Sequence, residues 1–293
     1  AAHERCEARA AAEVIGMAEH PANAVRAKKD SSIVVGCRLV KEGAAQGFFS
    51  AGSTGACLAA GTLVMGRVKG VARPALATVI PSPVRPVVMC DVGANADCKP
   101  EYLVQFAQMA SIYAEKILHI EHPRAALLNI GEEDTKGSQF AQEAHRLLSE
   151  RLPNFAGNAE GGDILAATYD VIVTDGFTGN VCLKTIEGTS KTLFKTLKDI
   201  MLATPLTKLG ALAIKGGLKQ LMVQVSPDTY GGAPLLGVKG ACIVGHGSSS
   251  ALAVKNGVLT AAGIVRTGVS EIIAQTVAST SASATIGDGR QNA

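Results

Sequence analysis

The chain contains no tryptophan, and aromatic residues make up only 4% of its 293 positions. Such a composition argues against an aromatic-rich β-sandwich. The sequence also lacks any CxxC pair, and an odd number of cysteines without one indicates neither a disulfide framework nor a zinc site. A reducing, cytoplasmic location is the natural interpretation. The seven cysteines are Cys6, Cys37, Cys57, Cys90, Cys98, Cys182 and Cys242.

Long hydrophobic runs and an excess of charge of either sign are also missing. No stretch approaches the roughly 18 consecutive apolar residues of a membrane-spanning helix, and the first residues lack a signal peptide's charged start and apolar core. The 28 basic and 25 acidic residues leave a net charge of +3. This balance is too small and too dispersed to indicate a nucleic-acid partner. We therefore expect a protein that is soluble or touches membranes only peripherally.

What the chain does have is an α/β pattern. Hydrophobic residues make up 47% and glycine occurs 32 times. Strand-length hydrophobic runs alternate with longer helical patterns, as in repeated βα units around a largely parallel sheet. We predict strands at residues 46–50, 75–80, 86–91, 125–130, 169–174 and 241–244. We predict helices at residues 30–42, 54–65, 100–118, 138–151, 180–202 and 248–267.

The two ends of the chain differ from this pattern. The chain opens directly in a polar helical stretch with no first strand, so we expect an N-terminal piece to be absent from this sequence. Residues 278–293 are rich in Ser, Thr, Ala and Gly without apolar periodicity, and we expect them to be disordered. Residues 1–277 are then expected to form a single domain.

Four predicted strand ends are rich in glycine and polar residues, and ligands of open parallel sheets bind where strands end and helices begin. In the first, residues 50–56, glycines let the backbone close around an anion and two hydroxyls can donate to it. Phosphate is the ligand that this loop predicts, and a plain capped turn is the alternative that stays open. The predicted phosphate ligands are Gly52, Ser53, Thr54 and Gly55.

The second loop, residues 91–100, carries two carboxylates, an amide and an ammonium group. We predict that Asp91, Asn95 and Asp97 orient a substrate. A solvated turn with a local pair between Asp97 and Lys99 remains an alternative. A metal site from Asp91 and Asp97 has no nearby histidine to complete it, so we predict no metal.

The third loop, residues 129–137, holds three acids and one cation just before a helix. The acids can be solvated first-turn residues favoured by the helix dipole, although we include Asp134 among the substrate contacts. A cation at a helix start is mildly unfavourable unless it answers a bound anion. Lys136 is therefore the leading catalytic candidate.

The fourth strand end, residues 174–180, runs into a glycine-rich turn and a long helix. Asp175, Thr178 and Gly179 are predicted substrate contacts. Asn180 is either the N-cap of that helix or a donor to a developing oxyanion. His246, before a Gly-Ser-Ser turn, is either a general base or a structural histidine.

Cys57 is a further alternative, because a thiol in the first turn of a helix can act as a nucleophile. Its small apolar neighbours favour a buried core residue instead.

Taken in order, these four motifs resemble those of the bacterial phosphate acyltransferase family known as PlsX. The resemblance extends from about residue 21 to 265 and includes residues 26–32, 158–163, 230–233 and 246–249. It implies a three-layer α/β/α fold related to isocitrate and isopropylmalate dehydrogenases and to phosphotransacetylases, working as a homodimer. Ser53, Ala159 and Gly162 depart from the family, which commonly has Asn, Val and Arg there. Family members also begin with a strand and an Asp-Ala-Met-Gly-Gly-Asp loop that this sequence lacks.

The resemblance implies an enzyme that converts acyl-acyl-carrier-protein and inorganic phosphate to acyl phosphate, without a cofactor. The product would pass to a membrane-embedded glycerol-3-phosphate acyltransferase in phospholipid synthesis. Lys136 and Asn180 match family residues thought essential. Three alternatives stay open: a phosphotransacetylase-like enzyme using acyl-coenzyme A, a nicotinamide-dependent dehydrogenase, and an inactive scaffold that docks the carrier protein.

Two surface segments are predicted to meet partners. Acyl carrier protein is acidic, and Arg26, Lys28 and Lys29 form the densest basic cluster of the chain, although a solvated helix start explains them equally. In residues 206–222, three lysines fall within a 40° arc opposite an apolar face, as in a helix lying on an anionic membrane. We expect Gly216 and Gly217 to split this segment into a hairpin with Leu209 and Leu212 at its tip. A helix packed on the core or at a dimer interface is the alternative.

Overall fold

The structure is a computed structural model that describes residues 6–288. Its centre is an eight-stranded sheet in the order β1-β8-β7-β2-β3-β6-β4-β5. The strands are β1 Gly47–Ser50, β2 Ala75–Ile80, β3 Val87–Cys90, β4 Ala125–Leu128, β5 Phe155–Ala159, β6 Val171–Val173, β7 Ala233–Leu236 and β8 Ala241–Val244. The helices are α1 Pro21–Ala27, α2 Ser32–Lys41, α3 Thr54–Ala60, α4 Pro100–Ile117, α5 Gln139–Arg151, α6 Gly161–Ala166, α7 Gly176–Met201, α8 Pro205–Gln224, α9 Ala251–Arg266 and α10 Val269–Asp288.

The predicted α/β class and three-layer arrangement are confirmed. Side chains alternate along each strand, so Val88 and Cys90 join a core beneath α4, α5, α9 and α10. Val87 and Met89 point to the other face, where α1, α2, α3 and α6 cover a second core. The sheet is therefore buried on both faces, as expected for strands that read as continuous hydrophobic runs.

Four of the seven strand pairs in the described chain are parallel, and the antiparallel pairs gather in the middle of the sheet. There β2 pairs antiparallel with both β3 and β7, and β7 pairs antiparallel with β8. The sheet therefore consists of two parallel blocks, β1-β8 and β3-β6-β4-β5, that run in opposite directions and are joined through β7 and β2. Strand composition does not distinguish the two directions, so the reversal has no signal in the sequence.

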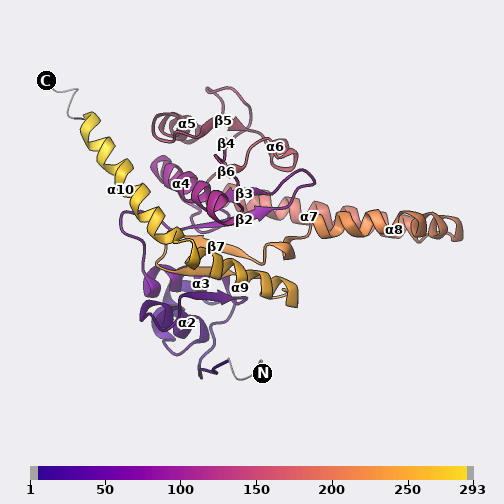
Figure 1. The fold of residues 1–293 in the computed structure, drawn as a ribbon, viewed down its shortest axis with the longest axis horizontal. Coiled ribbons are helices and arrows are strands. Elements are labelled where there is room, and N and C mark those ends of the chain that lie inside the picture. The colour runs from indigo at the N-terminus through magenta and orange to yellow at the C-terminus, as the bar shows by residue number, and fades with distance from the viewer. Residues whose placement is uncertain (1–5, 289–293) are drawn as a thin grey trace.

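The longest helices form an arm outside these layers. Helices α7 and α8 project from the body together (Figure 1), joined at residues 202–204. Thr204 caps α8, whose first residue is Pro205, and the helix then continues through Gly216 and Gly217 without a break. The predicted split at these glycines is therefore wrong. Glycine lowers helix stability, but unlike proline it keeps its backbone N–H donor, so it need not interrupt the helix. We call residues 176–224 the α7–α8 hairpin.

The C-terminal helix is longer than the sequence indicates. Helix α10 continues to Asp288, so the disorder expected from residue 278 is wrong for residues 278–288, and residues 289–293 lie outside the described chain. Val277 is buried against the core, and the Gln108 amide on α4 donates to the Thr280 hydroxyl at 2.8 Å. These contacts fix the helix at the point where the predicted tail begins, and alanine-containing sequence propagates it.

Candidate active site

Asp91 organises the loop that follows β3. The side chain is fully buried, and its carboxylate accepts hydrogen bonds from the backbone of Leu76, Ala94 and Asn95 at 3.0, 3.0 and 2.7 Å. The Asn95 amide adds a fourth donor at 2.9 Å. Burial raises the pKa of Asp91 above its usual range, while these donors oppose the rise. Asp91 and Asn95 therefore hold the loop together, which is a different task from the predicted substrate contact.

Replacing Asp91 by Asn should destabilise the protein. Three backbone N–H groups now donate to the two carboxylate oxygens of Asp91. In the variant an NH₂ group replaces one of these oxygens and faces the backbone donors without accepting from them. Leaving buried donors unpaired costs about 1–3 kcal/mol each, so we expect the free energy of unfolding to fall by several kcal/mol. Thermal melting measures this loss. Asp97 is exposed and makes no described hydrogen bond, so Asp97→Asn is the matched control. Equal melting temperatures for the two variants would contradict this role of Asp91.

The start of α7 is fixed by its cap and by two glycines. The Asp175 carboxylate accepts from the backbone of Phe177 and Thr178 at 3.0 and 2.9 Å, and from the Thr178 hydroxyl at 2.7 Å. Asp175 and Thr178 are thus occupied by capping. A Cβ atom on Gly179 would lie 1.9 Å from the Asp91 carbonyl oxygen, and the Gly176 amide donates to the Asn95 carbonyl at 2.8 Å. The loops after β3 and β6 are therefore locked to each other.

Asn180 lies in the second turn of α7, so the N-cap alternative for it is wrong: Asp175 is the cap. The Asn180 side chain is exposed and lies beside Gly93, where an added Cβ would be 3.6 Å from its Cγ atom. Its amide makes no hydrogen bond within residues 6–288. The side-chain amide of Asn180 is therefore available to hydrogen-bond to a ligand.

The turn after β1 is a well-capped helix start. The Ser53 hydroxyl is buried and accepts from the Ala56 backbone at 3.4 Å, and the Gly52 amide donates to the Ser50 hydroxyl at 3.2 Å. The side chain of Thr54 is exposed instead. Pro21 of α1 packs against Gly55, where an added Cβ would meet its ring at 2.6 Å. The capped-turn interpretation fits Ser53, and anion binding by this turn stays a prediction.

His246 follows β8 and contacts its own turn. Its Nδ1 atom lies 3.2 Å from the Ser248 backbone nitrogen and 2.7 Å from the Ser248 hydroxyl. Because a backbone N–H can only donate, this contact assigns Nδ1 as the acceptor and places the proton of the neutral ring on Nε2. In this tautomer Nε2 carries a proton and can donate it in a hydrogen bond to a negatively charged oxygen. A general base acting through Nε2 would instead need that nitrogen to be unprotonated.

Three predicted residues from distant parts of the sequence line one hollow. Thr54 at the start of α3, Asn180 on α7 and His246 after β8 meet around a space of about 520 Å³. This is large enough for phosphate and the reacting end of a thioester. Two lysines that the sequence interpretation did not assign to the site, Lys184 and Lys191, also line it. Their positions four and eleven residues after Asn180 place them on the same helical face, a signal that was available in the sequence.

Lys136 does not line this hollow. Two buried side chains hold its loop, residues 129–137. The Asn158 amide donates to the Glu133 carbonyl at 2.8 Å, and His145 Nε2 lies 3.3 Å from an Asp134 carboxylate oxygen. Lys136 Nζ is 3.7 Å from a Glu133 carboxylate oxygen, with nearly half of the side chain exposed. Asp134 is exposed apart from its contact with His145. Sequence reasoning found the loop but missed the two buried residues that hold it.

Cys57 is excluded as a nucleophile by its surroundings. The side chain is fully buried among apolar neighbours on α3. Burial raises the pKa of its thiol, and hydrogen bonding to Ser50 only partly opposes the rise. A neutral buried thiol is a poor nucleophile, so the core interpretation of Cys57 holds.

Within the described residues, no group of three or more His, Cys, Asp or Glu side chains is placed to hold a metal ion.

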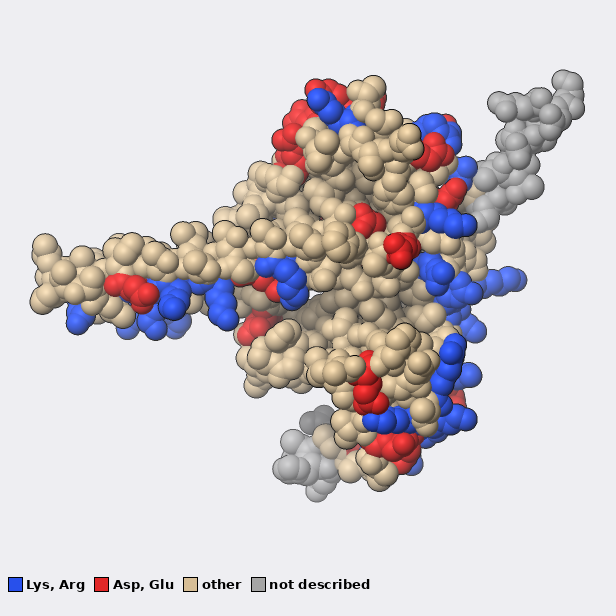
Figure 2. All heavy atoms as spheres, turned by 180° about the vertical axis from the view of Figure 1, so that it is seen from behind, with Lys and Arg blue, Asp and Glu red and all other residues tan. Residues whose placement is uncertain are grey.

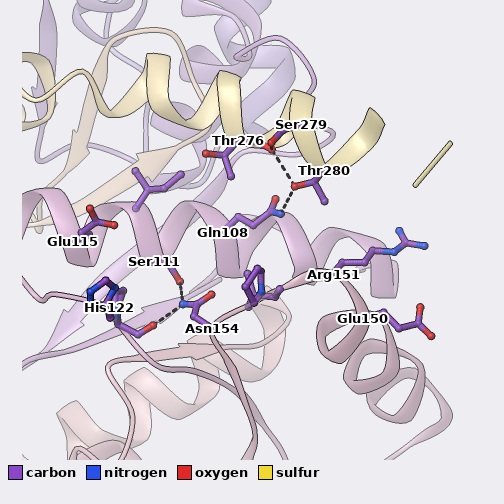
Figure 3. Close-up of a pocket in the computed structure, with 14 residues that line it drawn as sticks. Gln108, Ser111, Glu115, His122, Glu150, Arg151, Asn154, Thr276, Ser279 and Thr280 are labelled. Atoms are coloured by element: carbon purple, nitrogen blue, oxygen red, sulfur yellow. Dashed lines mark hydrogen bonds between the residues drawn. The ribbon is translucent and has the colours of Figure 1, made fainter. Parts of the chain in front are cut away.

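A larger cavity of about 810 Å³ lies elsewhere, between α4 and α10 (Figure 3). Two pairs of its polar side chains bind each other: Gln108 donates to Thr280 at 2.8 Å, and Asn154 donates to Ser111 at 3.0 Å. None of the predicted site residues lines it. The smaller hollow between α3, α7 and β8 is therefore the candidate active site.

Comparison with known proteins identifies the family. Residues 1–272 match a family model described as "Fatty acid synthesis protein". A phosphate acyltransferase of Desulfitobacterium hafniense is 53% identical over 270 residues, covering 92% of this chain and 81% of the relative. A phosphate acyltransferase of Halothermothrix orenii is 49% identical over 269 residues, covering 91% and 80%. The chain belongs to the phosphate acyltransferase family, PlsX.

Two solved structures show a partial likeness to the PlsX chain at low sequence identity. A phosphotransacetylase of Streptococcus pyogenes has a TM-score of 0.49 and 16% identity, with 87% of this chain and 70% of that chain covered. A branched-chain phosphotransacylase of Enterococcus faecalis has a TM-score of 0.49 and 15% identity, with coverage of 78% and 77%.

Proposed function

We propose that this protein catalyses the transfer of an acyl group from acyl carrier protein to inorganic phosphate. The observation that carries the proposal is the hollow where Thr54, Asn180 and His246 meet, in a chain about half identical to phosphate acyltransferases. The reaction needs an anion site beside a carbonyl site. It needs no cofactor, because a thiolate is already a good leaving group.

The chemistry requires positioning and charge stabilisation. A phosphate oxygen forms a bond to the thioester carbon, and the carbonyl electron pair moves onto its oxygen. The tetrahedral intermediate then collapses, the C–S bond breaks, and the departing thiolate takes a proton from water. Holding the reactants together and donating to the oxyanion can supply most of the rate. No covalent enzyme nucleophile is needed, in accord with the buried Cys57.

We assign roles by the groups each residue can offer. The Asn180 amide donates to the carbonyl oxygen as it becomes negative. Thr54, with the amides of residues 53–55, and Nε2 of His246 donate to phosphate. Lys136 supplies the cation that neutralises phosphate or the oxyanion, which requires its loop to approach the hollow when substrates bind. The exposed loop position and the single distant ion partner of Lys136 are compatible with such an approach.

The test compares acyl donors. The protein is incubated with phosphate and either acyl-acyl-carrier-protein or acyl-coenzyme A, and acyl phosphate is trapped with hydroxylamine. We expect phosphate-dependent product with the carrier-bound donor at much higher kcat/KM. A preference for acyl-coenzyme A would indicate a phosphotransacetylase-like enzyme instead. No product from either donor, with carrier protein still bound, would indicate a docking scaffold.

We further propose that the protein works as a homodimer in the cytoplasm and delivers its product at the membrane surface to a glycerol-3-phosphate acyltransferase. No residue of α8 is buried. The arm exposes large apolar side chains, including Leu202, Leu206 and Leu209 near its end. Exposed apolar residues of this number are a reason to expect a lipid or protein contact. Across residues 6–288 no single helix has the length and apolar composition of a membrane span, and only the bent pair α9 and α10 passes that test jointly.

Changing Leu206 and Leu209 to Glu tests the membrane contact. These side chains are 79% and 67% exposed, so the fold should tolerate the change. We expect flotation with anionic vesicles to be lost, because two charges replace apolar contacts at the interface. Turnover in solution should be unchanged. Flotation equal to that of the unaltered protein would contradict a membrane role for this end of the hairpin.

A further inference from the structure

The α7–α8 hairpin concentrates positive charge. It contains two acidic residues, Glu187 and Asp199, and a net charge of +5, whereas the whole chain has only +3. The rest of the molecule is therefore slightly acidic. The lysines of the hairpin are Lys184, Lys191, Lys195, Lys198, Lys208, Lys215 and Lys219.

These lysines form a stripe and are not scattered. At about 100° per residue, Asn180 and the four lysines of α7 fall within an arc of about 60°. The three lysines of α8 fall within about 40° of one another. Figure 2 shows basic side chains along one edge of the arm, the edge that faces the hollowed side of the molecule. We call these seven residues the lysine stripe.

The lysine stripe has few ionic partners of its own. Every one of its side chains is exposed. In the part of the chain that the structure describes, only Lys184 lies within ion-pair distance of a carboxylate, that of Glu187 at 2.7 Å. Six like charges on two adjacent helices repel one another. An acidic surface laid against them would relieve this repulsion.

The stripe leads out of the candidate active site. Lys184 and Lys191 line the hollow beside Asn180. Lys195 and Lys198 follow fifteen and eighteen residues after Asn180 on α7, which is about 22 and 27 Å along the helix axis at 1.5 Å per residue. A carrier protein presents its thioester on a long pantetheine arm, so the body of the carrier must rest outside the hollow. The outer lysines lie in that position.

We propose that the lysine stripe is the docking surface for the acidic acyl carrier protein, an inference that rests on the proposed function. An anionic membrane is the competing occupant. Lys198 and Lys208 lie in the turns next to the hairpin's end. The other five lysines run back toward the active site, which favours a partner that reaches the hollow. The cluster of Arg26, Lys28 and Lys29 is the competing docking surface. There Lys28 is already paired with Glu19 at 2.7 Å, and Asp30 adjoins it.

Charge reversal tests the docking surface. Lys195→Glu, Lys198→Glu and Lys215→Glu are combined, which leaves the residues lining the hollow unaltered. KM is measured for acyl-acyl-carrier-protein and for acyl-pantetheine, which lacks the protein. We expect KM for the carrier-bound donor to rise about tenfold or more, with less dependence on salt, while kinetics with acyl-pantetheine stay unchanged. The control combines Arg26→Glu with Lys29→Glu and should have little effect.

Several outcomes would overturn the docking proposal. Equal losses with both donors would show that the lysines act on the chemistry or the fold. A KM effect confined to the Arg26 and Lys29 control would place the carrier on α1. Loss of anionic-vesicle flotation, or a changed sedimentation mass, with intact carrier kinetics would assign the stripe to lipid or to a second copy.

A wild-type protein that forms no acyl phosphate from either donor would instead contradict the proposed function. Titration with acyl-acyl-carrier-protein by calorimetry then decides the docking surface separately. Weaker binding by the triple variant than by wild type would support it, and equal binding would overturn it.

Discussion

Lys136→Ala should reduce turnover by a factor of about a hundred to a thousand or more, while the protein melts as the unaltered chain does. Removing one positioned charge or donor from a developing oxyanion typically has an effect of this size. The effect on stability should be small, because Lys136 is half exposed and its ion pair with Glu133 spans 3.7 Å. Single-turnover kinetics and thermal melting measure the two quantities on the same preparation.

The matched control is Lys69→Ala, which removes an exposed lysine that lies in the turn before β2 and does not line the hollow. It should leave turnover unchanged. Lys136→Arg helps to separate charge from geometry, since it keeps the cation and should retain part of the activity. Full activity in a folded Lys136→Ala protein would remove Lys136 from the catalytic assignment.

Asn180→Ala should also lower kcat by a factor of about a hundred to a thousand, because the amide is the proposed donor to the carbonyl oxygen. Its melting temperature should not change, since Asn180 makes no described hydrogen bond and Asp175 caps the helix. Asn180→Asp should be at least as inactive, because it places an anion beside the developing negative charge. Kinetics with saturating phosphate measure both variants.

Asp175→Ala supplies the contrast. Loss of this N-cap should cost about 1 kcal/mol of stability, which a melting curve detects. A lower melting temperature for Asn180→Ala than for Asp175→Ala would mean that Asn180 is a structural residue after all.

Much of the fold follows from local pattern. The predicted strands at residues 75–80 and 241–244 coincide with β2 and β8 residue for residue, and the helix predicted at 100–118 matches α4 to within one residue. These segments have strong periodicity and clear boundaries, such as Pro100 in the first turn of its helix. Strands β5 and β7 were not predicted. Both contain small residues, glycine or proline and are defined mainly by their neighbours in the sheet.

The sequence indicated three residues that line the candidate site, Thr54, Asn180 and His246, but not Lys184 and Lys191. Glycine-rich strand ends indicated Thr54, Asn180 and His246, which the structure brings together around one hollow, and their roles stay a prediction. The sequence does not show that the side-chain oxygens of Asp91, Asp175 and Ser53 accept hydrogen bonds from backbone N–H groups. Those donors lie in other segments or depend on the exact start of a helix. It likewise does not reveal that His145 and Asn158 lie beneath the Lys136 loop.

Phosphorus NMR of the reaction with isotope-labelled phosphate tests the central claim most directly. Protein, acyl-acyl-carrier-protein and oxygen-labelled phosphate are mixed, and the product is followed with time. Direct attack predicts an acyl phosphate that retains every labelled oxygen, is formed in step with free carrier protein, and forms far more slowly with the Asn180→Ala variant. Release of carrier protein without acyl phosphate, or undiminished product from that variant, would contradict the account.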